Sequence, residues 1–374
     1  GYRDVSNVLA RIEGSEWPDE WVLVGGHIDA WGPGANDNVS GTASVFSAAR
    51  AIRALADGGL APRRTIVFAG WDGEEWGLIG STEWVEEHAD ELSRSAVAYL
   101  NQDMIAGPRF GASASPSLKP SIRAASSVIP SGTGTLREEW ARSDSTLSIG
   151  NLGGGSDFAG FYHHLGIPSV GHGFGGPYGL YHSAYDTREA VEVVDPGYRN
   201  QTLSSELVAI LALRLANAEV LPYDYAAFAV EIGDLWRAER AEIIAGMPQA
   251  VDAAGRLDTV LDSLAASARR FEAARERYLQ GPTGADRTRA ANAELRAVEQ
   301  ALTREAGLVG RPWSKNLAFS TDDRNGYATL ELPSISEART AGDAERVARE
   351  VDDFAGRVHA AAERLEAASQ ALAP

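Results

Sequence analysis

Two patterns of hydrophobic residues divide the chain near residue 220. Before this point, short apolar runs rich in β-branched residues alternate with stretches in which apolar residues recur every three or four positions. The short runs predict buried strands, and the longer stretches predict helices. The predicted strands are Trp21–Ile28, Arg64–Ala69, Ala96–Asn101 and Ile167–Val170, and the predicted helices are Asn38–Ala56 and Gly77–His88. Such alternation is typical of a mostly parallel sheet with helices on both faces.

The second half of the chain has the composition of long helices. Ala, Arg, Glu and Leu recur at helical spacing in four segments, which are Asp224–Ile244, Ala250–Tyr278, Asp286–Glu305 and Asp343–Ala371. Between the last two lies Leu308–Pro333, whose Gly, Pro, Asn and aromatic residues predict an ordered loop. We therefore predict an α/β domain in residues 1–220, with a mostly parallel mixed sheet flanked by helices, followed by an α-helical bundle in residues 221–374.

Composition narrows the classes of function. The 374 residues are 44% hydrophobic, enough for a large buried core, and no apolar run is long enough to predict a membrane-spanning segment. A net charge of −18 argues against a nucleic-acid partner, since phosphate binding requires a concentrated basic surface. Because the chain has no cysteine, a metal site in it must use His, Asp or Glu.

The densest group of candidate residues follows the first predicted strand, in GGHIDAWGPGAND. His27 ends an apolar run, so it should emerge at the carboxyl edge of the sheet, where ligands bind in folds of this class. Asp29 can point to the same side and orient the imidazole, as metal-bound histidines usually require. Asp37 directly precedes a predicted helix. It is therefore a candidate metal ligand or, alternatively, a helix N-cap.

A second group follows the next predicted strand, in WDGEEWGLIGS. Glu74 and Glu75 are adjacent in a predicted loop, so their side chains should point in different directions. One can then bind a metal while the other transfers a proton, as metal-assisted hydrolysis needs. The alternative is an acidic pair that stabilises the start of a helix.

Two further candidates come later in the chain. Asp103, in YLNQDMI, follows a third apolar run, and His182 lies in the Gly- and Tyr-rich segment GPYGLYHSAYDT. A lone carboxylate among apolar neighbours is costly unless it is paired or liganded. The complete candidate set is His27, Asp37, Glu75, Asp103 and His182. These ligand types suit zinc, and a bridging Asp37 would allow two ions to share one site.

At this point the motifs show a resemblance to a known family. The segments GGHIDAW, WDGEEWGLIGSTEW, NQD, LGGGSDFAGF, LGIPS and LYHSAYDT resemble, in this order, the zinc peptidases that include bacterial di-zinc aminopeptidases and glutamate carboxypeptidase. The similarity is greatest to the glutamate carboxypeptidase and transferrin-receptor branch, and it continues weakly through the helical half to RNGYA. It implies a zinc exopeptidase fold, two zinc ions per chain and a helical domain that forms a homodimer.

The resemblance also implies a role for individual residues. Glu74 would be the general base, Asp37 the bridging ligand, and the Tyr181 hydroxyl would stabilise the oxyanion of the reacting peptide. Which histidine shares an ion with Glu75 stays open. The implied substrate-binding residues are Ser156 and Asp157 in the Gly-rich segment and Asn325 and Tyr327 in RNGYA.

Two features depart from the glutamate-selective members. A lysine that helps to hold the substrate's C-terminal carboxylate is replaced by Gly326, and an arginine pair after GIPS is also missing. An acidic dipeptide is therefore a poor candidate substrate.

Four functions remain open at this stage. We expect a di-zinc exopeptidase that hydrolyses small peptides, of carboxypeptidase type. An aminopeptidase of the same family is the first alternative. A single-zinc glutaminyl cyclase and a non-catalytic, receptor-like dimer module are the others. Because export is common in the branch that the chain resembles, we expect a secreted or periplasmic protein, although the first residues do not resemble a signal peptide.

Overall fold

The computed structural model of the chain describes residues 3–247 and 250–374. Two compact units are present. The first extends to Phe161 and resumes at Pro168–Ala218, and the second comprises Tyr162–Ile167 and Glu219–Pro374. The short segment Tyr162–Ile167 thus belongs to the second unit although it interrupts the first one in the sequence.

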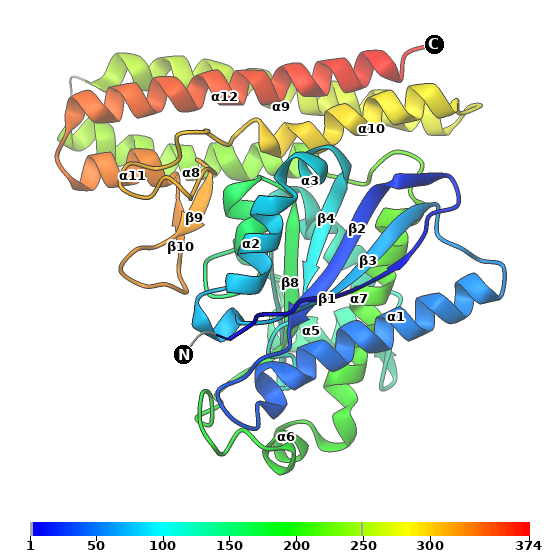
Figure 1. The fold of residues 1–374 in the computed structure, drawn as a ribbon. Coiled ribbons are helices and arrows are strands. Elements are labelled where there is room, and N and C mark those ends of the chain that lie inside the picture. Colours follow the sequence, from blue (N-terminus) through cyan, green and yellow to red (C-terminus); the bar gives the residue numbers. More distant parts are fainter. Residues whose placement is uncertain (1–2, 248–249) are drawn as a thin grey trace. The chain divides into compact units, whose positions relative to one another are not determined.

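A six-stranded mixed sheet forms the centre of the first unit (Figure 1). Its strands are β1 (Val8–Ile12), β2 (Trp17–His27), β3 (Arg64–Trp71), β4 (Ala96–Asn101), β5 (Arg109–Ala114) and β8 (Ser169–Gly175), in the spatial order β1-β3-β2-β4-β8-β5. The four central strands run parallel, and both edge strands are antiparallel to their neighbours. The predicted α/β fold with a mostly parallel sheet is confirmed.

Helices cover both faces of the sheet. On one face, α1 (Gly41–Asp57) and α7 (Arg199–Asn217) pack together, and Ser44 and Ser204 from these helices donate hydrogen bonds to the buried Gln102 side chain that follows β4. On the other face, α2 (Ile79–Glu87) contributes Trp84 to a cluster with Trp71 and Phe161. The shorter elements of this unit are η1 (Ala35–Ser40), η2 (Glu74–Trp76), α3 (Ala89–Ser95), η3 (Pro116–Leu118), α4 (Lys119–Ser126), β6 (Pro130–Ser131), β7 (Gly134–Thr135), α5 (Leu136–Ser143), α6 (Arg188–Val194) and η5 (Pro196–Tyr198).

The order of the strands places a topological switch point at the carboxyl edge of the sheet. Strand β2 lies between β3 and β4, so the connections that leave β2 and β3 depart in opposite directions along the sheet. Ligands in open α/β sheets bind at such a point, beyond the carboxyl ends of the strands. The loops that follow β2, β3 and β4 all begin there, and each carries candidate residues.

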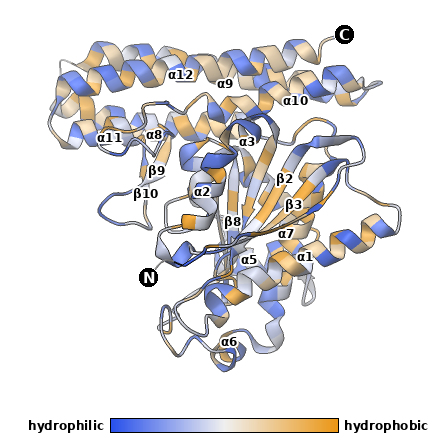
Figure 2. Ribbon diagram, in the orientation of Figure 1, coloured by the Kyte–Doolittle hydropathy of each residue, from blue (hydrophilic) through white to orange (hydrophobic). Residues whose placement is uncertain are grey.

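Long helices make up most of the second unit. They are α8 (Tyr225–Gly246), α9 (Val251–Leu279), α10 (Ala285–Gln300), α11 (Pro333–Thr340) and α12 (Ala344–Ala371). Helices α9 and α12 pack along their length, and Figure 2 shows apolar and polar residues alternating along both of them. The segment expected to be a loop contains a small hairpin, β9 (Phe319–Thr321) and β10 (Thr329–Glu331). Within the described residues, no helix combines the length and the apolar character needed to cross a bilayer.

Candidate metal centre

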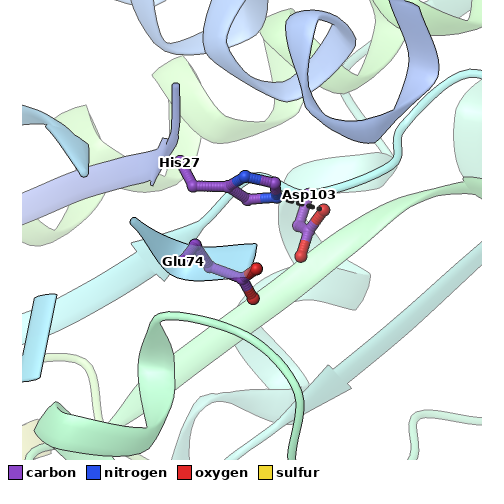
Figure 3. Close-up of side chains that lie close together, drawn as sticks. All are labelled: His27, Glu74 and Asp103. Atoms are coloured by element: carbon purple, nitrogen blue, oxygen red, sulfur yellow. Dashed lines mark ion pairs between the residues drawn. The ribbon is translucent and has the colours of Figure 1, made fainter. Parts of the chain in front are cut away.

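Five loops and strand ends bring the candidate side chains together at the carboxyl edge of the sheet. His27 is the last residue of β2, Glu74 and Glu75 begin η2 directly after β3, and Asp103 follows β4. Asp37 lies in η1, and His182 lies between β8 and α6. Figure 3 shows His27, Glu74 and Asp103 with their side chains pointing toward one another. Parallel strands end at the same edge, which explains why residues far apart in the sequence converge here.

The first group of possible ligand atoms surrounds the His27 ring. Its Nε2 lies 3.2 Å from Oδ1 of Asp37 and 3.4 Å from Oδ1 of Asp103. Both His27 and Asp37 are buried, with side-chain exposures of 1% and 5%. Ligand atoms of His27, Glu74 and Asp103 lie within 4.8 Å of one another, and so do those of His27, Asp37 and Glu75.

The second group surrounds the His182 ring. Its Nε2 lies 3.1 Å from Oδ2 of Asp37 and 3.0 Å from Oε2 of Glu75. In this structure the Glu75 carboxylate lies against His182, while the pairing of the two residues on one ion stays a prediction. The two oxygens of Asp37 face different imidazoles, so this carboxylate lies between the two groups.

These residues fit zinc in chemistry and in spacing. Zinc bonds of about 2.0–2.2 Å in a tetrahedral arrangement separate neighbouring ligand atoms by about 3.3–3.6 Å. The four distances above, from 3.0 to 3.4 Å, are close to this value. In addition, the buried oxygens Asp37 Oδ2, Glu75 Oε1 and Asp103 Oδ1 have no hydrogen-bond donor among the described residues when Nε2 of His27 and of His182 carries no proton, as in a metal-bound imidazole. Buried carboxylate oxygens without donors are costly unless a cation compensates them.

Asp29 holds two of the loops together. Its carboxylate accepts hydrogen bonds from the backbone N–H groups of Glu74 and Glu75, at 3.0 and 3.2 Å. The same carboxylate lies 3.4 Å from Nδ1 of His27, and the Asp29 carbonyl oxygen lies 3.0 Å from this nitrogen. Asp29 therefore orients the imidazole so that Nε2 faces the ligand group, and it also fixes the start of η2.

Asp186 and Asn38 support the loop that carries Asp37, and the sequence did not indicate these roles. The Asp186 carboxylate accepts hydrogen bonds from the backbone N–H groups of Asn36 and Asp37, at 2.9 and 3.0 Å. The Asn38 side chain donates to the carbonyl oxygens of His27 and Gln102, at 3.3 and 3.0 Å. The sequence offers one hint of the role of Asp186, which is its position four residues after His182. The backbone groups that it binds are about 150 residues away in the sequence, so the pattern could not identify them.

Burial and neighbouring charges set the protonation of this site. Burial opposes a charged His27 ring, but hydrogen bonds with the carboxylates of Asp103, Asp29 and Asp37 outweigh this effect and raise its pKa. Burial raises the pKa of Glu74 to about 9, and the nearby carboxylates add to the rise. Burial and the neighbouring Asp37 also raise the pKa of Glu75. A positive charge at the centre would therefore favour the ionised form of both glutamates.

The Gly-rich segment contacts one of the candidate ligands. The Ser156 hydroxyl donates a hydrogen bond to Oδ2 of Asp103 at 2.6 Å, and only 6% of the residue is exposed. Asp157 is fully buried, and burial raises its pKa to about 7. We expected both residues to line a substrate groove. In this structure Ser156 supports Asp103 through its hydroxyl, and the substrate-binding role of both residues stays a prediction.

The remaining predicted residues occupy more exposed positions. The ring of Tyr181 stacks on the His182 ring, with a centroid separation of 3.7 Å, and 38% of Tyr181 is exposed. Asn325 and Tyr327 lie between β9 and β10 in the second unit, where the Tyr327 N–H donates to the Asn325 side chain at 3.2 Å. Tyr327 is 62% exposed. The roles of these three residues remain predictions.

Comparisons with known proteins give the family. The model of peptidase family M28 matches residues 7–199, and the model of the transferrin receptor-like dimerisation domain matches residues 253–366. The probable glutamate carboxypeptidase LAMP1 of Arabidopsis thaliana is 37% identical over 342 residues, which cover 89% of this chain and 49% of that protein. The aminopeptidase NAALADL1 of Mus musculus is 36% identical over 243 residues, covering 59% of this chain and 33% of that protein.

A solved structure also matches. The peptidase M28 precursor of Shewanella amazonensis is 28% identical, with a TM-score of 0.45 over 58% of this chain and 46% of that one. The chain spans about half the length of LAMP1, the curated relative that it matches over most of its own residues. Since the peptidase family model matches more than half of the 374 residues, the chain belongs to peptidase family M28.

Proposed function

We propose that this chain is a zinc-dependent exopeptidase that holds two zinc ions. His27 and Asp103 would hold one ion, His182 and Glu75 would hold the other, and Asp37 would bridge them. The observation that carries the proposal is the position of Asp37, whose two oxygens lie 3.2 and 3.1 Å from the Nε2 atoms of different histidines. A carboxylate in this position suits a pair of cations that share one ligand.

Glu74 is the proposed general base. When bound, the zinc ions would acidify water and polarise the carbonyl group of the substrate. Glu74 is close to the ligands but is not needed to complete either set, so its carboxylate is available to take a proton from the attacking water. It would then deliver that proton to the nitrogen of the leaving amine. The hydrogen bond from its backbone N–H to Asp29 holds the residue in place for both transfers.

Tyr181 is the proposed donor to the developing oxyanion. Its ring stacks on that of His182, so its hydroxyl is carried by a residue directly next to one proposed ligand. A preorganised donor at such a place stabilises charge that develops in the transition state.

The direction of attack is proposed to be that of a carboxypeptidase. In support, LAMP1, which aligns with 89% of this chain, is named a probable glutamate carboxypeptidase. An aminopeptidase is the second candidate, because NAALADL1 carries that name. The two ligand groups speak against a single-zinc cyclase, and the complete ligand set speaks against a non-catalytic receptor-like module.

Reconstitution with zinc and a panel of blocked peptides test the proposal. The chain is first freed of metal with a chelator and then titrated with zinc while bound metal is measured. We expect two zinc ions per chain and hydrolysis that appears with them. N-acetylated dipeptides should be cleaved, and dipeptide amides with a free amino end should not. The reverse pattern would identify an aminopeptidase, and no hydrolysis with two bound zinc ions would reject the enzymatic proposal.

We also propose that the helical unit forms a homodimer. The match of residues 253–366 to the transferrin receptor-like dimerisation domain supports this. Light scattering coupled to size exclusion at micromolar concentration should give twice the mass of the chain. A monomer under these conditions would contradict the proposal.

A further inference from the structure

Two large aromatic side chains lie exposed beside the candidate metal centre. Trp31 follows β2 and Trp76 ends η2, and they are 47% and 68% exposed. Their ring centroids are 4.8 Å apart at an angle of 46°. The Trp31 ring also lies 6.4 Å from the ring of His182, edge to face. An exposed tryptophan pair is an unusual use of apolar surface, since such residues are normally found where a partner or ligand covers them.

The pair is held in place by the same contacts that build the metal centre. Asp29 lies two residues before Trp31, and its carboxylate binds the backbone of Glu74 and Glu75, which directly precede Trp76. The two loops therefore cannot separate without disturbing the candidate ligands. The aromatic surface is thus fixed relative to His182 and is present before any ligand arrives, which limits the entropy lost on binding.

The position of the pair fits a side chain of the substrate. A peptide bound at the proposed metal centre would have its reacting bond close to His182. The Trp31 ring lies 6.4 Å from the His182 ring, which is less than two steps of 3.8 Å between consecutive Cα atoms. The side chain of a residue that flanks the bond to be cut can therefore reach the Trp31 ring. The charge of this region disfavours an acidic side chain. Among the described residues, the lining of the space beside Trp31 and His182 includes Asp37, Glu75 and Asp186 and no Lys or Arg, so it offers a substrate carboxylate repulsion and no cationic partner.

We propose that Trp31 and Trp76 form a subsite for a large apolar or aromatic side chain next to the scissile bond of a peptide. This inference rests on the proposed peptidase function and specifies the class of substrate. Stacking against two tryptophans removes apolar surface of the substrate from water, and aromatic side chains gain additional contact energy from the ring faces. Small and acidic residues gain neither.

Kinetics with matched dipeptides test the subsite. Ala-Phe, Phe-Ala, Ala-Leu, Ala-Glu, Ala-Lys and Ala-Ala are compared in the zinc-loaded protein and in the Trp31→Ala and Trp76→Ala variants. We expect kcat/KM for the best Phe-containing dipeptide to exceed that for Ala-Ala by about tenfold or more. Each variant should lower this ratio several-fold through KM, and Trp31→Phe should preserve most of it. Phe46→Ala is the control, since Phe46 is 50% exposed on α1 and is not part of the site.

Three results would overturn the subsite. The first is a preference for Glu or Lys over Phe. The second is a ratio of kcat/KM between the Phe-containing dipeptide and Ala-Ala that does not change in the tryptophan variants. The third is an equal loss of kcat for every dipeptide, which would mean that the tryptophans only hold the two loops together. If the wild-type protein cleaves no dipeptide, the proposed function fails separately. A titration of tryptophan fluorescence in Glu74→Gln with Ala-Phe and Ala-Glu then decides the subsite. The subsite is supported if Ala-Phe binds more tightly than Ala-Glu and this difference is lost when Trp76→Ala is added to Glu74→Gln. Equal binding of the two dipeptides overturns it.

Discussion

The hydroxyl of Ser156 donates a hydrogen bond of 2.6 Å to Oδ2 of Asp103. The same hydroxyl accepts a hydrogen bond of 2.8 Å from the Asn101 side chain, which is itself 3.0 Å from the hydroxyl of Tyr99. A chain of buried hydrogen bonds thus runs along β4 and ends on one oxygen of a candidate ligand. The other oxygen of Asp103 is left facing His27, at 3.4 Å.

Replacing Ser156 by alanine should weaken zinc binding while leaving the fold intact. The change removes the hydrogen bond that orients Asp103 and leaves the Asn101 amide without its acceptor. Loss of such a supporting contact typically costs about 10- to 100-fold in metal affinity. Competition for zinc with a chromophoric chelator measures the effect. Ser126→Ala is the matched control, because Ser126 is also buried and its hydroxyl donates to the backbone of Arg123, outside the site. Equal zinc affinity of the two variants would contradict the supporting role.

The Glu74→Gln variant should retain both zinc ions and lose nearly all turnover. Glutamine matches the size of glutamate but cannot accept the proton of the attacking water, and loss of a general base costs about 10²- to 10⁴-fold in rate. Zinc content by mass spectrometry and kcat for an N-acetylated dipeptide are measured on the same sample. A kcat within threefold of the wild type, at full zinc content, would exclude Glu74 as the base.

Part of the site could be predicted because of simple geometry. His27 and Asp103 directly follow or end apolar runs, and parallel strands finish at one edge, so their convergence follows from the sequence pattern alone. The roles of Asp186 and Ser156 could not be predicted in this way. Their partners lie 149 and 53 residues away in the sequence, and only the folded loops decide which polar atom they contact.

The edge strands were missed for a related reason. Strand β1 has four exposed residues out of five, so it lacks the apolar run that identified the central strands. It pairs with β3 through its backbone, and this pairing leaves no trace in the hydrophobic pattern. The hairpin of β9 and β10 was likewise hidden, because strands of three residues are shorter than the pattern needed to detect them.

Removal of zinc should destabilise the first unit. Without cations, the buried or partly buried carboxylates of Asp37, Glu75 and Asp103 remain next to one another. Zinc at about 1,000 times its dissociation constant would stabilise the folded state by about 4 kcal/mol. For a unit of this size, that corresponds to a rise in Tm of about 8–16 °C. Scanning calorimetry with excess chelator and with excess zinc measures the difference. Superimposable unfolding curves would argue against a metal site in this chain.

The buried ion pair of Glu20 and Arg64 should be essential for stability. The Arg64 Nε lies 2.6 Å from the Glu20 carboxylate, and the two side chains are 0% and 3% exposed. Glu20→Ala leaves the guanidinium without this partner, which costs about 3–5 kcal/mol. The neighbouring pair of Glu16 and Arg63 is the control, since its side chains are 51% and 24% exposed and Glu16→Ala should cost less than about 1 kcal/mol. Urea unfolding of both variants gives the comparison, and equal losses of stability would refute it.

His172 should make the folded state less stable in acid. The residue is buried, its Nδ1 lies 3.2 Å from the Ser204 hydroxyl and its Nε2 lies 3.4 Å from the Gln102 amide. Burial lowers its pKa to about 3, against 6.5 in an exposed histidine. Between these values the unfolded chain binds a proton that the folded chain does not. The free energy of unfolding should therefore be at its full value above pH 6.5 and decrease by up to about 1.4 kcal/mol per pH unit below it.

Urea unfolding of the zinc-free protein from pH 7.5 to pH 4.5 isolates this contribution. Carboxylates also titrate toward the acid end of this range, but they do so equally in wild type and in His172→Asn. The loss of stability on acidification should therefore be about 1–3 kcal/mol smaller in His172→Asn than in wild type. His359→Asn should behave like wild type, because its side chain is 62% exposed. If all three proteins lose the same free energy of unfolding, His172 is not the group that opposes folding in acid.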